Sequence, residues 1–306
     1  MMAGIQKPRP VFMRGIRGEL LLDEPMSRHT SWRVGGIAEY FFTPKDRTDL
    51  LQFLSQLPAE IGIHWVGLGS NLLVRDGGVK GVVIRSSKGL TDWRLVGASK
   101  LYAEAGVACA QLARNAAKHC LSGAEFLSGV PGSFGGALAM NAGAFGSETW
   151  PLVESVECTD RRGNVSRLDR GDISFGYRFV ELPADTWLLG GTLQLNKEPN
   201  DYRGREKIRS LLDKRSSSQP VQSANAGSVF RNPPGDFAAR LIEHCGLKGR
   251  SLGGAQVSAV HANFIVNTGA ASAADIEALM VEVQDSVYAD AGVRLEPEVR
   301  ILGDAQ

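Results

Sequence analysis

The stretch GVPGSFGGALAMNAGAFG, residues 129–146, is dense in glycine and poor in polar side chains. It has too many glycines for a stable helix interior and too few polar residues for an ordinary surface loop. Small residues at this density allow a planar or phosphate-bearing ligand to lie directly on the backbone, and Ser133 and Asn141 could donate hydrogen bonds to it. Close helix packing or an irregular loop would give the same composition, so the interpretation stays open at this point.

Another glycine segment, GLGSNLLVRDGG, spans residues 67–78 and is the first of the two in chain order. Gly67 and Gly69 flank a turn between two apolar stretches, and Ser70 and Asn71 follow it. Closely spaced glycines let backbone N–H groups converge on an anion, which suits a pyrophosphate. The segment lacks the GK[ST] of a Walker A loop, and leucine stands where the Rossmann fingerprint needs its last glycine. A tight turn between two strands explains the pattern equally well.

The composition is that of a folded protein with two modest domains or one large one. Hydrophobic residues make up 43% of the 306 positions and charged residues 22%, which argues against disorder. The 34 Lys and Arg nearly balance the 33 Asp and Glu without forming a basic stripe, so no nucleic-acid or membrane partner is expected. No apolar run reaches about 18 residues and no signal peptide opens the sequence, which favours the cytoplasm. The cysteines and histidines have no metal-ligand spacing, so no metal site is expected.

Hydrophobic periodicity indicates a larger N-terminal part and a smaller C-terminal one. It predicts helices at 48–57, 110–123, 202–220, 236–246 and 272–292. It predicts strands at 81–85, 101–106, 153–160, 187–195, 261–267 and 296–302. Ser272 and Asp275 have capping-box spacing at the start of the last helix, and Gly123 and Gly292 are predicted helix stops. A Ser-rich turn near position 216 is the best candidate for a domain boundary, with an α+β module after it.

A third group of polar residues has no motif that identifies its chemistry. Tyr177 and Arg178 stand together, NAGSVFRNP spans residues 225–233, and Glu296 and Glu298 flank a proline in the predicted last strand. Residues two apart in a strand share one face, but that proline interrupts the regular ladder. The pattern therefore leaves open which glutamate faces a site. Taken singly, residues of these types are usually solvated surface groups or caps.

In chain order, these segments resemble the signature of the UDP-N-acetylenolpyruvoylglucosamine reductase family. The segments are TSWRVGG (30–36), GLGSNLLV (67–74), GVPGSFGGALAMNAGAFGSE (129–148), FGYR (175–178), AGSVFRNP (226–233), HANFIVN (261–267) and LEPEVRILG (295–303). The resemblance extends over nearly the whole chain. The glycine segments are shared with other flavoproteins of the vanillyl-alcohol-oxidase type, whereas AGSVFRNP and LEPEV discriminate this family from them.

The resemblance implies an α+β fold with two domains. Residues 1–215 would form a two-lobed FAD-binding domain of the vanillyl-alcohol-oxidase or PCMH type, with its core at about 30–200, and residues 216–306 a smaller α+β substrate-binding domain. FAD would be bound without a covalent link, which agrees with the lack of histidine and cysteine in GVPGSFGG. The implied FAD contacts are Gly67, Gly69, Ser70, Asn71, Leu72, Gly129, Pro131, Gly132, Ser133, Gly135, Gly136, Asn141 and Gly143.

The family reduces the enolpyruvyl ether of a UDP-sugar to UDP-N-acetylmuramate in peptidoglycan precursor synthesis, and the resemblance implies this small-molecule substrate here. NADPH would be the reductant, with hydride passing from FAD N5 to C3 of the enolpyruvyl group and a proton from Ser228 to C2. By position in the family's motifs, Arg178 and Glu298 correspond to the groups that act on the substrate's carboxylate and enolate. Arginine suits this role, since it can hold a carboxylate bidentately. The residues at family substrate contacts are Tyr177, Arg231 and Asn232.

Two positions depart from the family pattern, with Val180 where serine is common and Arg231 where lysine is common. Arginine keeps the charge but changes reach and donor geometry, so the substrate contacts there are expected to differ. The only tyrosine between Ser228 and Glu298 is Tyr288, inside a predicted helix, which indicates the shorter family type without a tyrosine loop over the substrate. An FAD-dependent oxidase on the same scaffold and a non-catalytic nucleotide-sugar-binding module are the alternatives. None of these interpretations requires an oligomer.

Overall fold

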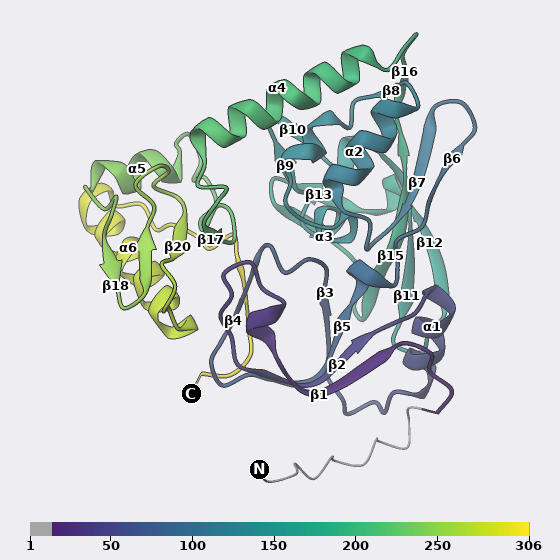
Figure 1. Ribbon diagram of the computed structural model, residues 1–306, viewed down its shortest axis with the longest axis horizontal. Coiled ribbons are helices and arrows are strands. Elements are labelled where there is room, and N and C mark those ends of the chain that lie inside the picture. The colour runs from purple at the N-terminus through teal and green to yellow at the C-terminus, as the bar shows by residue number, and fades with distance from the viewer. Residues whose placement is uncertain (1–13, 306) are drawn as a thin grey trace.

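The computed structural model describes residues 14–305, which form two lobes followed by a C-terminal domain (Figure 1). Residues 1–13 of the predicted first domain lie outside the described range. Helices and β-sheets are combined in each part, so the predicted α+β class is confirmed. Within residues 14–305, no helix has both the length and the apolar character that crossing a membrane requires.

The first lobe is a four-stranded sheet with one helix packed on it. In spatial order the strands are β1 (Glu19–Pro25), β2 (Ile37–Thr43), β5 (Val79–Arg85) and β3 (Ile63–Val66). β1 runs antiparallel to β2, whereas β5 is parallel to both of its neighbours. Helix α1 (Arg47–Gln56) begins where the Asp46 side chain accepts a hydrogen bond from the backbone N–H of Asp49. Its Phe53 stacks on Phe42 of the sheet and closes the core of this lobe.

The second lobe is a five-stranded antiparallel sheet that shares one apolar core with the helices on it. The strand order is β12 (Val165–Asp169), β11 (Val153–Asp160), β15 (Thr186–Gln194), β7 (Lys100–Glu104) and β6 (Trp93–Val96). The helices are α2 (Cys109–Lys118) and α3 (Phe134–Ala139). Three small antiparallel pairs complete the lobe: β13 (Ser174–Gly176) with β14 (Phe179–Glu181), β9 (Gly143–Ala144) with β10 (Ser147–Glu148), and β8 (Leu121–Ser122) with β16 (Asn196–Lys197).

The long helix α4 (Tyr202–Ser218) runs from the second lobe to the C-terminal domain (Figure 1). That domain has the strand order β17 (Ala224–Asn225), β20 (Ile265–Asn267), β19 (Ala255–Val257) and β18 (Ser251–Leu252). Its helices are α5 (Ala238–His244) and α6 (Ala273–Ala291). The predicted capping box of Ser272 and Asp275 is confirmed, as is the predicted stop at Gly292, which has a left-handed conformation with φ of 65°.

The first lobe supplies part of the C-terminal domain's structure. Trp32 is fully buried in the core of that domain, and its indole Nε1 donates to the backbone oxygen of Ile265 at 2.7 Å. The Asp76 carboxylate accepts the first two backbone N–H groups of α6. The last strand, β21 (Arg300–Leu302), pairs in parallel with β4 (Leu72–Val74), which follows the first glycine turn. The domain boundary at 215/216 stays a prediction. The C-terminal end of the chain returns to the first lobe, because β21 pairs with β4 there.

Two predictions about helices are corrected. Helix α2 ends at Lys118 rather than near Gly123, because Cys120 has a left-handed backbone with φ of 58° and turns the chain. The glycine-dense stretch contains helix α3 despite the glycines within it. Ser133 caps this helix, and a Cβ on Gly135 would lie only 2.7 Å from the Ala105 Cβ. Glycine is needed there so that α3 can pack closely against Ala105, which follows β7 in the second lobe.

The predicted strands 261–267 and 296–302 are regular only in their last three residues, β20 and β21. The residues ahead of β20 and those ahead of β21 both contact the segment around Phe230. Phe230 forms an isolated bridge with Pro297, and its backbone N–H and oxygen respectively donate to and accept from the Asn263 side chain. Proline has no N–H to continue a ladder, so pairing at this point cannot extend. The irregular segment ahead of β21 contains Glu298, and the one ahead of β20 contacts Val229, the residue after Ser228.

Replacing Trp32 with phenylalanine should lower the free energy of unfolding by about 1–3 kcal/mol, since the Ile265 carbonyl would lose a buried hydrogen-bond donor. Urea denaturation followed by circular dichroism measures this change. Trp93→Phe is the control, because Trp93 is only partly buried and its indole donates no hydrogen bond within residues 14–305. An equal loss in both variants would contradict the role given to the Trp32 indole N–H.

Candidate active site

The two glycine segments face each other in the folded protein. A Cβ added to Gly67 would lie 2.1 Å from the Ser133 hydroxyl oxygen, and one added to Gly132 would lie 3.2 Å from that of Ser70. The segments come from different lobes, so their contact brings the lobes together. The absence of side chains on these glycines allows the two segments to approach each other closely, and their contacts to a ligand stay predictions.

Gly69 is the residue that shapes the turn of the first segment. Its φ of 67° lies in the left-handed region, and a Cβ there would lie 1.9 Å from the backbone oxygen of His29. Gly69 also accepts a hydrogen bond at its own oxygen from the N–H of Ser31. Two independent reasons, conformation and space, therefore require glycine at this position.

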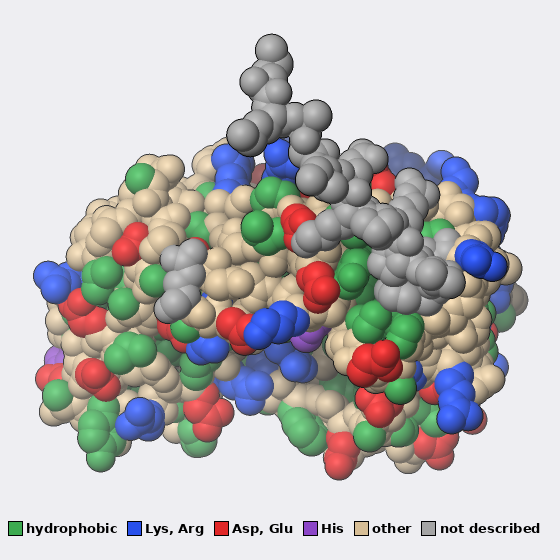
Figure 2. Space-filling model, turned by 90° about the horizontal axis from the view of Figure 1, so that it is seen from below, with side chains coloured by type: hydrophobic (Ala, Val, Ile, Leu, Met, Phe, Trp, Pro, Cys, Tyr) green, Lys and Arg blue, Asp and Glu red, His purple; other side chains and the backbone are tan. Residues whose placement is uncertain are grey.

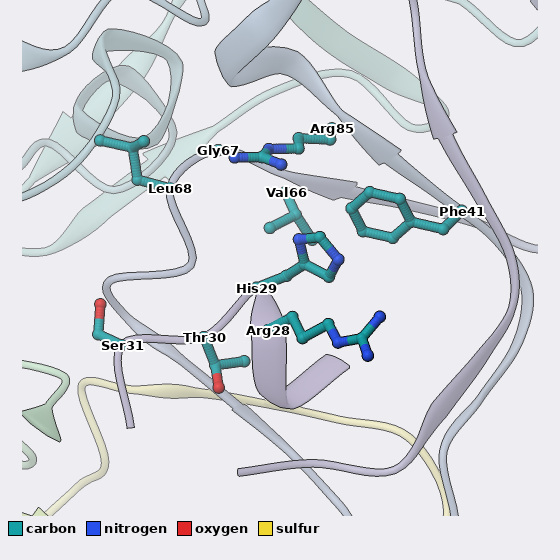
Figure 3. A pocket seen from close by; sticks show the side chains of 9 residues that line it. All are labelled: Arg28, His29, Thr30, Ser31, Phe41, Val66, Gly67, Leu68 and Arg85. Atoms are coloured by element: carbon teal, nitrogen blue, oxygen red, sulfur yellow. The ribbon is translucent and has the colours of Figure 1, made fainter. Parts of the chain in front are cut away.

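A pocket opens beside this turn (Figure 3). Its lining residues are Arg28, His29, Thr30, Ser31, Phe41, Val66, Gly67, Leu68 and Arg85. The His29 ring is held in place by a 2.9 Å contact to the Glu24 carboxylate and by stacking on Phe41, whose centroid is 4.0 Å away. Arg85 adds positive charge beside the backbone of Gly67 (Figure 3), which suits a phosphate-bearing ligand, whereas the Arg28 guanidinium lies 3.6 Å from the Glu24 carboxylate. Seen from below, Lys and Arg side chains gather in a hollow of the surface (Figure 2).

The other predicted cofactor contacts occupy different environments. Gly129 packs against the Phe145 ring, which a Cβ would meet at 2.4 Å, and Leu72 is buried in β4. Pro131 is exposed in the loop that leads into α3, and Gly136 is exposed within α3 itself. The glycine turns and the exposed loop positions therefore remain predicted ligand contacts, whereas Leu72 reaches a ligand only through its backbone.

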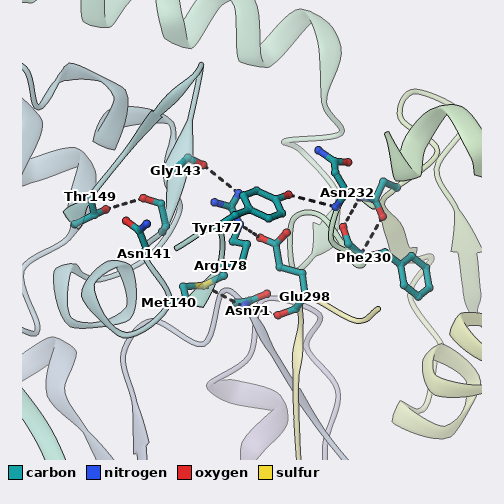
Figure 4. Close-up of polar contacts among 12 residues, drawn as sticks. Asn71, Met140, Asn141, Gly143, Thr149, Tyr177, Arg178, Phe230, Asn232 and Glu298 are labelled. Atoms are coloured by element: carbon teal, nitrogen blue, oxygen red, sulfur yellow. Dashed lines mark hydrogen bonds and ion pairs between the residues drawn. The ribbon is translucent and has the colours of Figure 1, made fainter. Parts of the chain in front are cut away.

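Two predicted cofactor contacts use their side chains within the protein. The Asn71 amide donates to the backbone oxygen of Glu298 at 3.1 Å and to the Met140 sulfur (Figure 4). The Asn141 amide donates to Glu148 and to the backbone oxygen of Gly176, both at 2.9 Å. Asn141 is fully buried, and its side-chain hydrogens are both used. Its side chain therefore does not donate to a ligand in this structure, and a contact to FAD would have to come from its backbone.

Arg178 and Glu298 meet between the second lobe and the C-terminal domain (Figure 4). Arg178 Nε lies 2.7 Å from Glu298 Oε1, and its Nη2 donates to the backbone oxygen of Gly143 at 3.2 Å. Arg178 is the second residue of the two-residue loop between β13 and β14, and its φ is 54°. A left-handed arginine is unfavourable by about 1–2 kcal/mol, so the surrounding contacts must hold it there.

The structure decides between the two glutamates that flank Pro297. The Glu298 side chain is 11% exposed and contacts Arg178, whereas the Glu296 side chain is 76% exposed. Burial raises the pKa of the Glu298 carboxyl above its ordinary value, and the Arg178 guanidinium opposes this shift without cancelling it. Glu298 is therefore the member of the pair that can hold a proton inside the site.

Ser228 lies next to Glu298 through backbone pairing. The N–H of Glu298 donates to the backbone oxygen of Val229 at 2.7 Å, so the two segments run side by side. Within residues 14–305 the Ser228 hydroxyl makes no hydrogen bond, and the side chain is half-buried. Asn263 fixes this segment from the other side, because its carboxamide both accepts from and donates to the backbone of Phe230. Sequence reasoning missed this role of Asn263, although the HANFIVN segment that contains it was noticed.

The three predicted substrate contacts lie around the same junction. The Tyr177 hydroxyl accepts a hydrogen bond from the backbone N–H of Asn232 at 3.3 Å, which joins the two halves of the site (Figure 4). Arg231 Nη1 lies 3.8 Å from the Glu296 carboxylate. The Nε of Arg231 is buried and has no hydrogen-bond partner among the described residues. A buried guanidinium nitrogen without a partner is unfavourable unless a ligand supplies an acceptor.

The first and second glycine segments fit FAD. Their glycines leave no room for a Cβ, because the two segments pack closely on each other and on His29, and Arg85 places positive charge beside Gly67. A pyrophosphate requires this combination of close N–H donors and cationic side chains. The first segment and the Arg178–Glu298 pair are connected directly, since Asn71 belongs to that segment and contacts the backbone of Glu298.

Comparison with known proteins defines the class of this chain. Residues 38–169 match the model of an FAD binding domain, and residues 219–302 match that of the UDP-N-acetylenolpyruvoylglucosamine reductase C-terminal domain. The chain is therefore an FAD-containing oxidoreductase with a separate C-terminal domain of this reductase type.

Similar whole proteins support the same conclusion. The UDP-N-acetylenolpyruvoylglucosamine reductases of Methylococcus capsulatus and Alkalilimnicola ehrlichii are 54% and 52% identical to it. The first alignment covers 95% of both chains, and the second covers 94% of this chain and 96% of the other. The crystal structure of the reductase from Thermus caldophilus superposes with a TM-score of 0.77 at 34% identity, over 94% of this chain and 99% of that one. The chain belongs to the UDP-N-acetylenolpyruvoylglucosamine reductase family.

Replacing Gly69 with alanine should strongly reduce the FAD content of the purified protein, because the new Cβ would force the turn away from His29. Gly97→Ala is the matched control, since Gly97 has nearly the same φ of 65° but no heavy atom within 4 Å of the added Cβ. Both variants should lose about 1–2 kcal/mol from the left-handed strain. Flavin absorbance per polypeptide measures the content. Near-normal FAD in a folded Gly69→Ala protein would contradict the predicted contact.

Proposed function

We propose that this protein reduces UDP-N-acetylglucosamine enolpyruvate to UDP-N-acetylmuramate, with NADPH as the reductant, in peptidoglycan precursor synthesis. The observation that supports this most directly is the buried contact between Arg178 and Glu298, beside the segment that contains Ser228. Bound FAD supplies the hydride that this reaction needs. The chain's own residues bind the substrate's carboxylate, stabilise the charge that develops on it, and provide one proton.

Arg178 is proposed to bind the substrate carboxylate. Its Nε and Nη2 have protein partners, and the remaining guanidinium hydrogens are available for a carboxylate. When hydride is added at C3 of the enolpyruvyl group, negative charge spreads from C2 into that carboxylate. A guanidinium fixed before the reaction stabilises this charge without having to reorganise.

Glu298 and Ser228 are proposed to handle protons. The raised pKa of Glu298 favours a protonated carboxyl, which can donate a hydrogen bond to an enolate oxygen. Ser228 is proposed to donate its hydroxyl proton to C2, which an enolate carbanion is basic enough to accept. Tyr177, Asn232 and Arg231 are proposed to bind the rest of the substrate. The unpartnered Nε of Arg231 suits an acceptor such as a substrate phosphate oxygen.

We further propose a division of labour between residues 1–215, for FAD, and residues 216–306, for the substrate. The matches at 38–169 and 219–302 support this division. The substrate is a small molecule, so neither a nucleic acid nor a membrane partner is part of the proposal, and a single chain contains every named residue. A reaction that uses NADPH and a nucleotide sugar would take place in the cytoplasm.

Three measurements test the proposed function. The purified protein should be yellow and should release intact FAD on denaturation. It should oxidise NADPH continuously only when the enolpyruvyl UDP-sugar is present, since without this substrate the reaction stops once the flavin is reduced. Oxygen consumption with small alcohols in place of this dependence would favour the alternative oxidase, and a colourless protein that cannot be reconstituted with FAD would favour a non-catalytic binding module.

In the Ser228→Ala variant, NADPH should reduce the FAD at close to the wild-type rate. Reoxidation of the FAD should then stall when the enolpyruvyl UDP-sugar is added. The Ser228 proton goes to the substrate, so the step with NADPH does not require it. An interaction used only in the later transition state affects turnover much more than substrate affinity. Stopped-flow absorbance of the flavin separates the two steps. Loss of the NADPH step with normal reoxidation would show that this role is wrong.

The rate of reoxidation by substrate should fall as the pH rises through the raised pKa of Glu298, because only the protonated carboxyl can donate a hydrogen bond. Glu298→Gln keeps an N–H donor but has no proton to lose, so its rate should lack this decrease with pH. Glu296→Gln is the control and should keep the wild-type profile, since the Glu296 side chain is exposed. A wild-type rate that does not change with pH would contradict the proton role of Glu298.

A further inference from the structure

Arg178 occupies a position that its own backbone does not favour. It is the second of two residues in the tight loop between β13 and β14, and φ values near 54° are ordinary for glycine but not for arginine. The neighbouring Tyr177 is 47% exposed, so the loop has little packing of its own. Such a conformation persists only where surrounding groups hold it.

The glycine-dense segment holds this loop at two points. Asn141 Nδ2 donates to the backbone oxygen of Gly176, the residue that closes the hairpin, at 2.9 Å. The backbone oxygen of Gly143 accepts from Arg178 Nη2 at 3.2 Å. One contact fixes the loop backbone and the other fixes the guanidinium. Together with Glu298, they determine where the free edge of the guanidinium points.

The Asn141 carboxamide is itself held in one orientation. Its Oδ1 accepts from the backbone N–H of Trp150 at 2.9 Å, and its second amide hydrogen is used by the Glu148 carboxylate. Trp150 N–H can only donate and the Gly176 oxygen can only accept, so a flipped amide would lose both bonds. Asn141 has a φ of 47° and is fully buried, and asparagine tolerates the left-handed region better than most residues.

We propose that Asn141 is a positioning residue for the reaction, because it fixes through Gly176 the strained loop that directs the Arg178 guanidinium at the substrate carboxylate. This inference rests on the proposed function. It differs from the cofactor contact that the sequence predicts for Asn141, since the side chain acts on the substrate side of the site. Glu148 is the anchor that holds the amide in the required orientation.

The double variant Asn141→Asp/Glu148→Gln isolates the link to Gly176. The new carboxylate at position 141 keeps the acceptor for Trp150, and the new amide at position 148 donates to that carboxylate. The pair therefore exchanges donor and acceptor and keeps its net charge, and the donor to the Gly176 oxygen is replaced by a carboxylate oxygen, which can only accept. Glu148→Gln alone is the matched control, because its new amide can still present an oxygen to Asn141 and the Gly176 link is retained.

FAD content and thermal unfolding of both variants should be close to wild type, and NADPH should reduce both at the wild-type rate. In the double variant, reoxidation at saturating enolpyruvyl UDP-sugar should be roughly 10- to 100-fold slower, because a small misplacement of a catalytic group has effects of that size. The control should reoxidise normally. Hydrogen–deuterium exchange in residues 174–181 should be faster in the double variant than in the control.

A double-mutant cycle with Arg178→Ala tests whether Asn141 acts through Arg178. The exchange of residues 141 and 148 should have little further effect on reoxidation once the guanidinium is gone. Low FAD content, a fully additive effect, or unchanged reoxidation in the double variant would each overturn the inference. A wild-type protein that the substrate does not reoxidise would overturn the proposed function and this inference with it, and that outcome is recognised without any variant.

Discussion

The buried contact between Arg178 and Glu298 is the interaction on which the site depends. The two residues are 120 positions apart in the chain and belong to different halves of the molecule. Removing one partner of a buried pair leaves the other without compensation, which costs about 3–5 kcal/mol in measured cases. The fold must therefore hold the β13–β14 loop and the segment before β21 at a constant separation. Much of the remaining architecture serves that requirement.

The connections between the lobes explain how that separation is kept. β21 pairs with β4, the strand that follows the first glycine turn, and Glu298 lies two residues ahead of β21. Asp76, just after that turn, caps α6, and Arg75 forms a bidentate contact with Glu277 on the same helix. Trp32 fills the core of the C-terminal domain from the first lobe. The proposed FAD cradle and the proposed substrate site are therefore parts of one connected structure.

Glycines have two different structural roles in this arrangement. Gly67 and Gly69 allow close contact with Ser133 and His29 at a turn where a ligand is expected, whereas Gly135 allows helix α3 to pack closely against Ala105. Composition alone cannot separate these uses, because the requirement in both cases is the absence of a Cβ. Asn141 shows the same ambiguity among polar residues. An amide in a glycine-rich stretch looks like a ligand donor, yet its hydrogens hold the loop of Arg178.

The sequence by itself determined the local features that depend on short-range chemistry. These include the capping box of α6, the extent of β11, the glycine turn at Gly69 and, through the ordered motifs, the family. The residue pattern left open which of Glu296 and Glu298 faces the site, since Pro297 breaks the alternation on which such an inference depends, and the family resemblance alone pointed to Glu298. It also could not show that Asn71, Asn141 and Asn263 act on distant backbone. Only the tertiary structure decided these points, because burial and hydrogen-bond partners are set by residues far apart in the chain.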